Sequence, residues 1–293
     1  MKNKLSLFAV PYVGWMSIFV VAPIIIMVVY AFSTAAGDFT LENFARMGTY
    51  TAVFTRSFKL AIIATLIALL IGYPVSYMLS KEGPQVQRIA MVLIMLPMWM
   101  NFLLRTYSWM SILENNGLLN QLFQQIGLID LYNQIAMHFA ADPAAYVPID
   151  HFQMIGTQGA VVLGMVYNYL PFMILPIYSV LVKLDHSLIE AARDLGASSV
   201  QVFCKVILPL SLPGVLSGIT MVFVPSVSTF AISRLLGGGT QMMLGDLIEQ
   251  QFLGGAYNPQ LGAAIALVMM AIVVVCMLVM NRFGDGEEQA VML

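Results

Sequence analysis

The chain has 293 residues, of which 60% are hydrophobic and only 10% are charged, and its formal net charge is −2. A soluble globular domain carries about 25% charged residues, so the composition excludes a water-soluble fold, and the small net charge excludes nucleic-acid binding as the main activity. Cys204 and Cys276 are too far apart in the sequence to suggest a disulfide framework or a metal site. At about 20 apolar residues per span, the chain can hold about six transmembrane helices. We therefore predict an all-α polytopic bundle in contact with membrane lipid.

Long apolar runs follow one another along the chain, and we expect each to cross the membrane as one helix: 7–32, 57–80, 88–112, 157–182, 212–235 and 260–282. The first run exceeds the apolar core of a signal peptide, about 7–15 residues, which favours a retained span. Cytoplasmic termini agree with the positive-inside rule, because they place most Lys and Arg residues inside: Lys2, Lys4, Lys81, Arg88, Lys183, Arg193, Lys205 and Arg282. The expected units are an N-terminal span with its outer loop (1–54), a core of five spans (55–282) and a cytoplasmic tail (283–293).

Prolines interrupt most of the apolar runs: Pro23, Pro74, Pro97, Pro171, Pro176 and Pro225. Each removes a backbone donor and favours a kink. Neighbouring helices can accommodate such kinks, or the kinks can act as hinges, and proline content alone does not distinguish the two.

The outer loop after the third run contains an apolar stripe at helical spacing within 117–127, formed by Leu118, Leu119, Leu122, Phe123 and Ile126. Such a stripe predicts a helix lying on the membrane surface.

Residues 183–209 form a polar segment between the fourth and fifth runs, and they read as two short helices with a break. Ser187 and Glu190 have the spacing of a capping box, which predicts that Glu190 caps the first helix. Gly196 supplies the left-handed position that ends such a helix, Ser198 or Ser199 can cap the second, and Pro209 is expected to stop it. The apolar stripes expected to support the two helices are Leu184, Leu188, Ala191, Ala192 and Leu195, then Val200, Phe203, Val206 and Ile207. Local rules leave open whether this segment is a simple elbow or a docking knob for another protein.

The run EAARDLGASSVQVFCKVILP resembles the EAA motif of permease subunits of binding-protein-dependent ABC importers. The match falls on Glu190, Ala191, Ala192, Gly196, Leu208 and Pro209, with Val206 in the place of an isoleucine, and Arg193 and Asp194 lie inside it. Three further runs, at 96–120, 164–185 and 234–253, are similar to the spermidine/putrescine permease subunits of that family. The stretch 137–152 is longer and more polar than that pattern.

The resemblance implies that 183–209 is a coupling segment that sits in a cleft of a cytoplasmic ATPase. It implies a bacterial cytoplasmic-membrane importer working by alternating access. The implied partners are a second, similar permease, two copies of the ATPase, and an extracellular or periplasmic substrate-binding protein. Permeases for ferric ion, thiamine or sulfate, and a secondary transporter or channel, are the alternatives.

A polyamine is a polycation, and aromatic rings near the pathway could attract its ammonium groups: Trp99, Tyr107, Trp109, Tyr167 and Tyr169. Trp and Tyr also gather at membrane interfaces for other reasons. Arg105 lies near the outer boundary of the third run, so its guanidinium is expected to reach the headgroups, with a gate or structural ion pair inside the bundle as the alternative.

The sequence contains no phosphate-binding Gly-x-x-x-x-Gly-Lys-Ser/Thr loop and no credible catalytic set, so we expect no enzyme activity and no cofactor in this chain, with ATP and Mg bound by the partner ATPase. No carboxylate falls deep inside an expected span, which argues against proton or ion coupling. Asp246 and Glu249 are expected in the last outer loop, as cation guides or as ordinary solvated residues.

Overall fold

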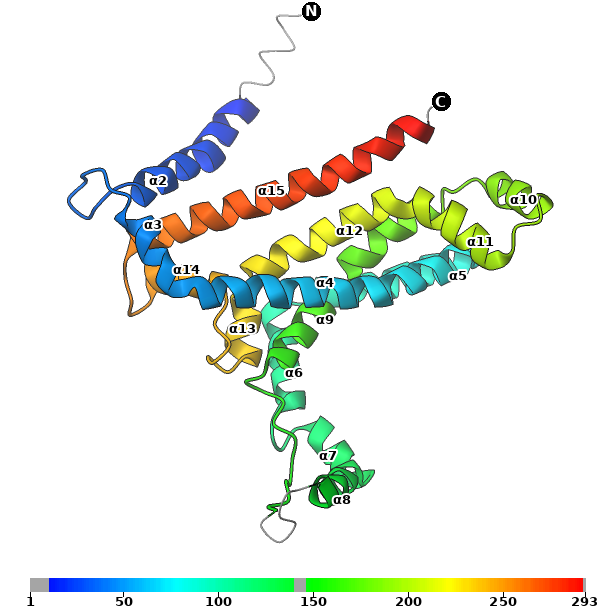
Figure 1. Cartoon of the computed structure of the whole chain (residues 1–293), viewed down its shortest axis with the longest axis horizontal. Coiled ribbons are helices and arrows are strands. Elements are labelled where there is room, and N and C mark those ends of the chain that lie inside the picture. Colours follow the sequence, from blue (N-terminus) through cyan, green and yellow to red (C-terminus); the bar gives the residue numbers. More distant parts are fainter. Residues whose placement is uncertain (1–10, 140–145, 292–293) are drawn as a thin grey trace, which may run out of the picture.

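The computed structural model describes residues 11–139 and 146–291, and nearly all of its secondary structure is helical. In chain order the helices are η1 (Ser17–Val21), α2 (Ala22–Ala31), α3 (Glu42–Arg46), η2 (Met47–Tyr50), α4 (Thr51–Ser80), α5 (Pro84–Trp99), α6 (Phe102–Leu113), α7 (Leu118–Gln125), α8 (Leu128–Phe139), α9 (Gln158–Leu181), α10 (His186–Asp194), α11 (Ser199–Val202), η3 (Phe203–Ile207), α12 (Leu208–Ser228), α13 (Ala231–Leu236), α14 (Leu244–Leu253) and α15 (Pro259–Val291). By length and composition, 5 helices can cross a membrane, or up to 6 if a bent pair counts as one span. The predicted all-α membrane bundle is confirmed, and α15 ends on the same side as α10 and α11 (Figure 1). Lys2, Lys4 and the start of the first apolar run lie outside the described residues.

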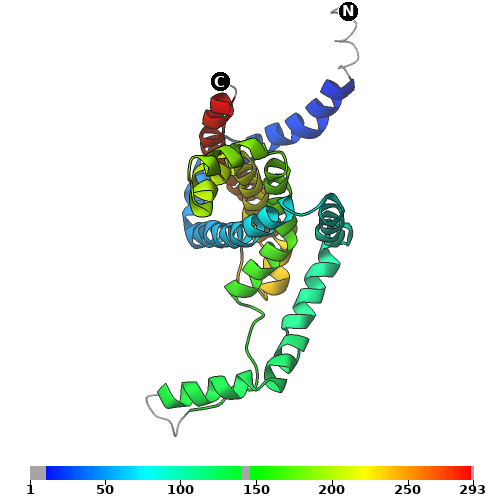
Figure 2. The same ribbon diagram turned by 90° about the vertical axis from the view of Figure 1, so that its right-hand side faces the viewer.

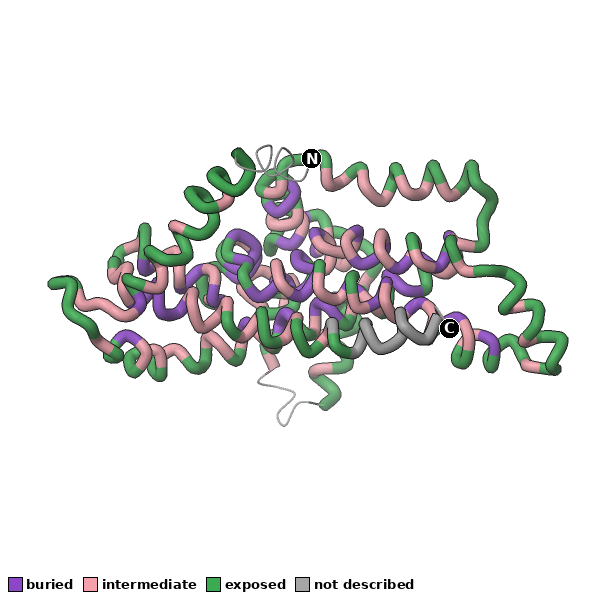
Figure 3. Tube along the Cα trace, turned by 90° about the horizontal axis from the view of Figure 1, so that it is seen from above, coloured by how far each residue is buried: buried purple, intermediate pink, exposed green. Residues whose placement is uncertain are grey.

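Helices α4, α9 and α12 form the centre of the bundle, where buried residues concentrate (Figure 3). Small residues allow their backbones to approach closely: a Cβ added at Gly214 of α12 would lie 2.8 Å from the Pro176 carbonyl oxygen of α9. The Ser76 hydroxyl of α4 donates to the Ile174 carbonyl of α9 at 3.1 Å. These contacts make the three helices one packed unit.

The expected third span, 88–112, is wrong as a single helix. The chain breaks between α5 and α6, which meet at 90°. Met100 is extended there, and the Asn101 side chain accepts a hydrogen bond from the Leu103 amide at 2.8 Å, so Asn101 starts a new helix. With 16 residues, α5 is about 24 Å long, shorter than the hydrocarbon core. Figure 2 shows α6, α7 and α8 extending away from the bundle. The predicted helix within 117–127 corresponds to α7.

The expected stop at Pro209 is also wrong, because one helix of 30 residues runs from Ser199 to Ser228. A π turn, η3, precedes the proline, and the Leu208 amide donates to the Phe203 carbonyl five residues back. This wider turn accommodates a residue that lacks an amide hydrogen. The same arrangement precedes Pro23 in the first span, where η1 leads into α2. The expected fifth span, 212–235, therefore begins earlier, and it ends earlier at the extended Thr229.

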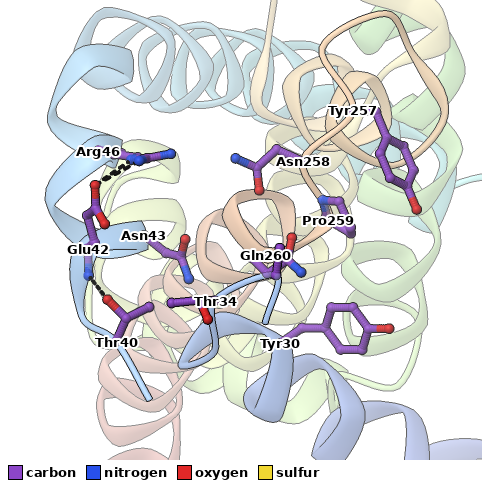
Figure 4. A pocket seen from close by; sticks show the side chains of 11 residues that line it. Tyr30, Thr34, Thr40, Glu42, Asn43, Arg46, Tyr257, Asn258, Pro259 and Gln260 are labelled. Carbon is purple, nitrogen blue, oxygen red and sulfur yellow. Dashed lines mark hydrogen bonds and ion pairs between the residues drawn. The ribbon is translucent and has the colours of Figure 1, made fainter. Parts of the chain in front are cut away.

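The outer end of the bundle is more ordered than the expected loops at 113–156 and 236–259. Helix α14 lies in the second of these loops and buries Leu244 and Leu247 against α4, α12 and α15. A pocket of about 590 Å³ lies between the outer ends of α2, α3 and α15 (Figure 4). Glu42, the carboxylate of this pocket, is paired with Arg46 at 2.7 Å, so no free negative charge is offered there.

Candidate functional site

The coupling segment, residues 183–209, begins with a capped helix. The Asp185 carboxylate accepts a hydrogen bond from the Ser187 amide at 2.9 Å, and this bond lowers the pKa of Asp185. The predicted Ser187–Glu190 capping box is wrong, because α10 begins at His186 and places Glu190 at its fifth position, beyond reach of the cap. Glu190 is exposed, so its carboxylate is free to contact another molecule.

The end of α10 is fixed by a Schellman motif. Gly196 has φ +79°, as the sequence predicts, and its amide donates to the Arg193 carbonyl at 2.8 Å. The Ala197 amide donates to the Ala192 carbonyl at 3.1 Å, which completes the pair of bonds that defines the motif. A Cβ at Gly196 would meet no atom of the described residues within 4 Å, so glycine is required here for its backbone conformation and leaves an open surface beside it.

Helix α10 has two apolar faces. Ile189 and Ala192 pack against the core formed by α4, α9 and α12. Leu188 and Leu195 face outward, and Leu195 is 89% exposed. The single supporting stripe expected from the sequence is therefore divided between the two faces. An apolar surface beyond the membrane-spanning helices indicates a protein partner.

The second helix of the segment is capped reciprocally, and this confirms Ser198 as the N-cap. The Ser198 amide donates to the Gln201 side-chain oxygen at 2.8 Å, and the Gln201 amide donates to the Ser198 hydroxyl at 3.4 Å. Val202 faces the core, whereas Val200, expected in the supporting stripe, is 71% exposed.

The residues of the EAA-like motif fall into two groups. Those on or next to the exposed surface of α10 are Glu190, Ala191, Ala192, Arg193, Asp194 and Gly196, of which Ala192 alone is partly buried. Val206, Leu208 and Pro209 lie in η3 and the first turn of α12, at the base of the segment. The first group forms a candidate contact surface, and the second joins this surface to the fifth span.

The aromatic residues suggested for a substrate pathway are only partly brought together. Trp109 of α6 meets Tyr167 of α9 edge to face, with ring centroids 5.3 Å apart. Tyr169 packs between two core clusters. Trp99 and Tyr107 are exposed, and among the described residues neither forms an aromatic ring pair.

Arg105 does not reach the headgroups as expected. Its side chain turns into the protein, the residue is only 8% exposed, and its Nε and Nη1 atoms have no hydrogen-bond partner among the described residues. A buried guanidinium without an acceptor is costly. The predicted alternative, a role inside the bundle, agrees with this position.

The sequence did not reveal a buried polar cluster at the outer end. Asp246 is 4% exposed rather than solvated; its carboxylate accepts hydrogen bonds from the Ser233 hydroxyl at 2.5 Å and the Met243 amide at 3.0 Å. Arg234 lies 4.0 Å from Asp246 and pairs with Glu249. Burial raises the pKa of Asp246 and outweighs these hydrogen bonds and the nearby guanidinium. One sequence signal could have predicted the hydrogen bond from Met243 to Asp246: an acidic residue at the third position of a helix commonly reaches back to the start of that helix.

Comparisons with known proteins agree with this geometry. Residues 68–286 match the family model described as "Binding-protein-dependent transport system inner membrane component". The spermidine/putrescine transport system permease protein PotB of Escherichia coli K12 is 35% identical over 281 residues, covering 93% of this chain and 95% of PotB. The inner membrane ABC transporter permease protein YdcU of the same organism is 27% identical over 234 residues, covering 79% and 71% of the two chains.

Solved structures show the same fold. A chain of a bacterial ABC transporter that imports the acidic polysaccharide alginate superposes with a TM-score of 0.76 at 16% identity, covering 97% of this chain and 96% of that one. A chain of the MetNI methionine ABC transporter gives a TM-score of 0.54 at 18% identity, covering 84% of this chain and 98% of that one.

Proposed function

Because this chain belongs to the family of binding-protein-dependent transport system inner membrane components, we propose that it is the permease subunit of an ATP-driven importer of polyamines such as spermidine and putrescine. The ATP-driven part of the proposal rests on α10. This helix has a cap at its start, a Schellman motif at its end and apolar side chains on its solvent-exposed face. The polyamine part rests on the identity with PotB over most of both chains.

In this proposal the partners are a second, similar permease, two copies of an ATPase that binds ATP and Mg, and an external substrate-binding protein. The ATPase contacts Glu190, Arg193 and the apolar surface of α10. Closure of the ATPase pair moves the segment and opens the pathway outward, where the binding protein delivers its cargo. The permease itself carries out no bond chemistry.

The pathway side of the proposal starts from α6 and α9, where Trp109 and Tyr167 form a ring pair and Arg105 lies buried. Aromatic faces attract ammonium groups, whereas a guanidinium repels a polycation. We therefore assign the rings to transient substrate contact and Arg105 to a gate or ion pair with an acceptor from the second permease or from another state of the cycle.

Reconstitution tests the proposal directly. Vesicles that contain the two permeases, the ATPase and the binding protein should accumulate labelled spermidine only when ATP is supplied. A Glu190→Arg variant should insert normally but lose ATPase association and uptake. Uptake of sulfate or iron instead of spermidine would overturn the substrate assignment, and normal uptake by Glu190→Arg would overturn the coupling role.

A further inference from the structure

A second pocket lies at the cytoplasmic end of the bundle and shares Arg193 with the exposed surface of α10. It has a volume of about 360 Å³, within the range of about 300–1,000 Å³ that is usual for small-molecule sites. The ends of α4 and α9 form one side, and α10, α11 and the end of η3 form the other. Its occupant would therefore contact both the spans and the coupling segment.

The charged and donor groups of this pocket are all suited to an anion. Lys81, Arg193 and His186 line it together with the hydroxyl-bearing Ser80 and Ser199, and no acidic residue of the described part of the chain lines it. The Lys81 ammonium lies 3.8 Å from the centre of the Tyr77 ring, which holds it at the pocket by a cation–π contact.

Acidic residues adjoin these groups in the sequence but form no ion pair with them among the described residues. Each of the three cationic residues has an acidic neighbour in the sequence: Glu82 follows Lys81, Asp185 precedes His186 and Asp194 follows Arg193. Within residues 11–139 and 146–291, none of Lys81, His186 and Arg193 forms an ion pair within 4.0 Å. The Asp185 carboxylate accepts a hydrogen bond from the Ser187 amide at the start of α10, and it does not line the pocket. The pocket therefore keeps its positive charge.

The other lining residues favour one kind of anion. Leu181, Val182, Leu184, Ile189, Val202 and Ile207 give the pocket an apolar side next to its cationic side. A free phosphate has no use for an apolar wall, whereas a phospholipid presents a phosphate and an acyl chain together. Basic pockets between transmembrane helices on the cytoplasmic side are suited to anionic headgroups.

We propose that this pocket binds a phosphate group, carried by an anionic phospholipid of the inner leaflet. The headgroup phosphate contacts Lys81, His186 and Arg193, and the glycerol and upper acyl chain lie on the apolar side. The lipid then connects the coupling segment to the inner ends of α4 and α9. The proposal concerns the coupling machinery, and it does not depend on which solute is carried.

The test measures retained phosphatidylglycerol by mass spectrometry on the assembled transporter. The complex is equilibrated with this lipid and washed at about 0.5 M salt, which screens loose attraction to surface charges. The test variant is Lys81→Gln with His186→Gln; Arg193 stays unchanged because it also belongs to the contact surface. The control is the double variant Lys183→Gln with Lys205→Gln. It removes two cations of the coupling segment that do not line the pocket.

The expected result is about a fivefold loss of retained lipid in the test variant and none in the control. Displacement of the lipid by inorganic pyrophosphate would show that a soluble phosphate compound suffices, and it would overturn the lipid as the occupant. Equal retention in wild type, test variant and control would overturn the proposal. Weaker ATPase association of the test variant in lipid-free detergent would also overturn it, because the pocket would then be a protein contact. Since retention is measured without transport, a wrong substrate assignment does not affect this result.

Discussion

Truncation of one exposed leucine gives the sharpest test of the contact surface. Leu195 is 89% exposed at the end of α10, so Leu195→Ala should leave the stability of the permease unchanged. If the ATPase covers this side chain, the truncation removes carbon groups whose burial contributes about 0.8 kcal/mol each. Because interface leucines are seldom covered completely, we expect a loss of about 1–2 kcal/mol in association free energy, or about 5- to 30-fold in affinity.

The assay is a binding isotherm of the ATPase on the permease pair in lipid nanodiscs, together with the thermal unfolding of the permease pair alone. The matched control is Leu253→Ala at the end of α14, where Leu253 is 83% exposed toward the opposite side. An equal loss in both variants, or no loss in Leu195→Ala, would refute the assignment of this surface. A lowered melting temperature for Leu195→Ala alone would refute the claim that the side chain is free in the isolated permease.

Three further predictions concern single contacts. Asp185→Ala should destabilise α10 because it removes the helix cap, whereas Glu190→Gln should leave the stability of α10 unchanged and weaken ATPase association; thermal melting and the binding isotherm separate the two effects. Gly214→Ala should lower the melting temperature, because its Cβ would meet a rigid carbonyl of α9 at 2.8 Å, while Gly159→Ala, with its nearest neighbour at 3.7 Å, should melt near the wild-type value; equal melting of both would contradict the close packing. Because the pKa of Asp246 is raised in the folded protein, its contribution to stability should fall as the pH rises from the ordinary value of 3.8 through the raised value. Denaturation measured at several pH values should show this fall in the free energy of unfolding, and Asp246→Asn should remove it.

Sequence patterns predicted most of the spans and the end of α10, because both depend on local composition. Gly196 needs a left-handed backbone whatever surrounds it, and an apolar run of span length needs lipid or protein on all sides. The break at Asn101 was missed because hydropathy over 88–112 does not change there, although an Asn after Pro97 was a local helix-start signal.

Tertiary contacts decided the features that sequence could not predict. The burial of Asp246 depends on Ser233, which lies on a different helix, and periodicity could not tell whether Arg105 faces lipid or protein. On α10 the apolar pattern itself was ambiguous, because a surface that binds a partner is apolar in the same way as one that supports the fold. Leu188 and Ile189 are adjacent in the sequence, yet Leu188 is exposed and Ile189 packs against the core.

The unbroken helix from Ser199 to Ser228 has a mechanical consequence. At 1.5 Å per residue it forms a lever about 45 Å long, with one end beside α10 and the other at Thr229. A tilt of about 10° around the cytoplasmic end would sweep the outer end through about 8 Å. Had Pro209 ended the helix, a flexible joint would have absorbed such a displacement close to its origin. The π turn instead carries the hydrogen-bonded helix past Pro209, so a movement at the cytoplasmic face is passed along α12 to the outer one.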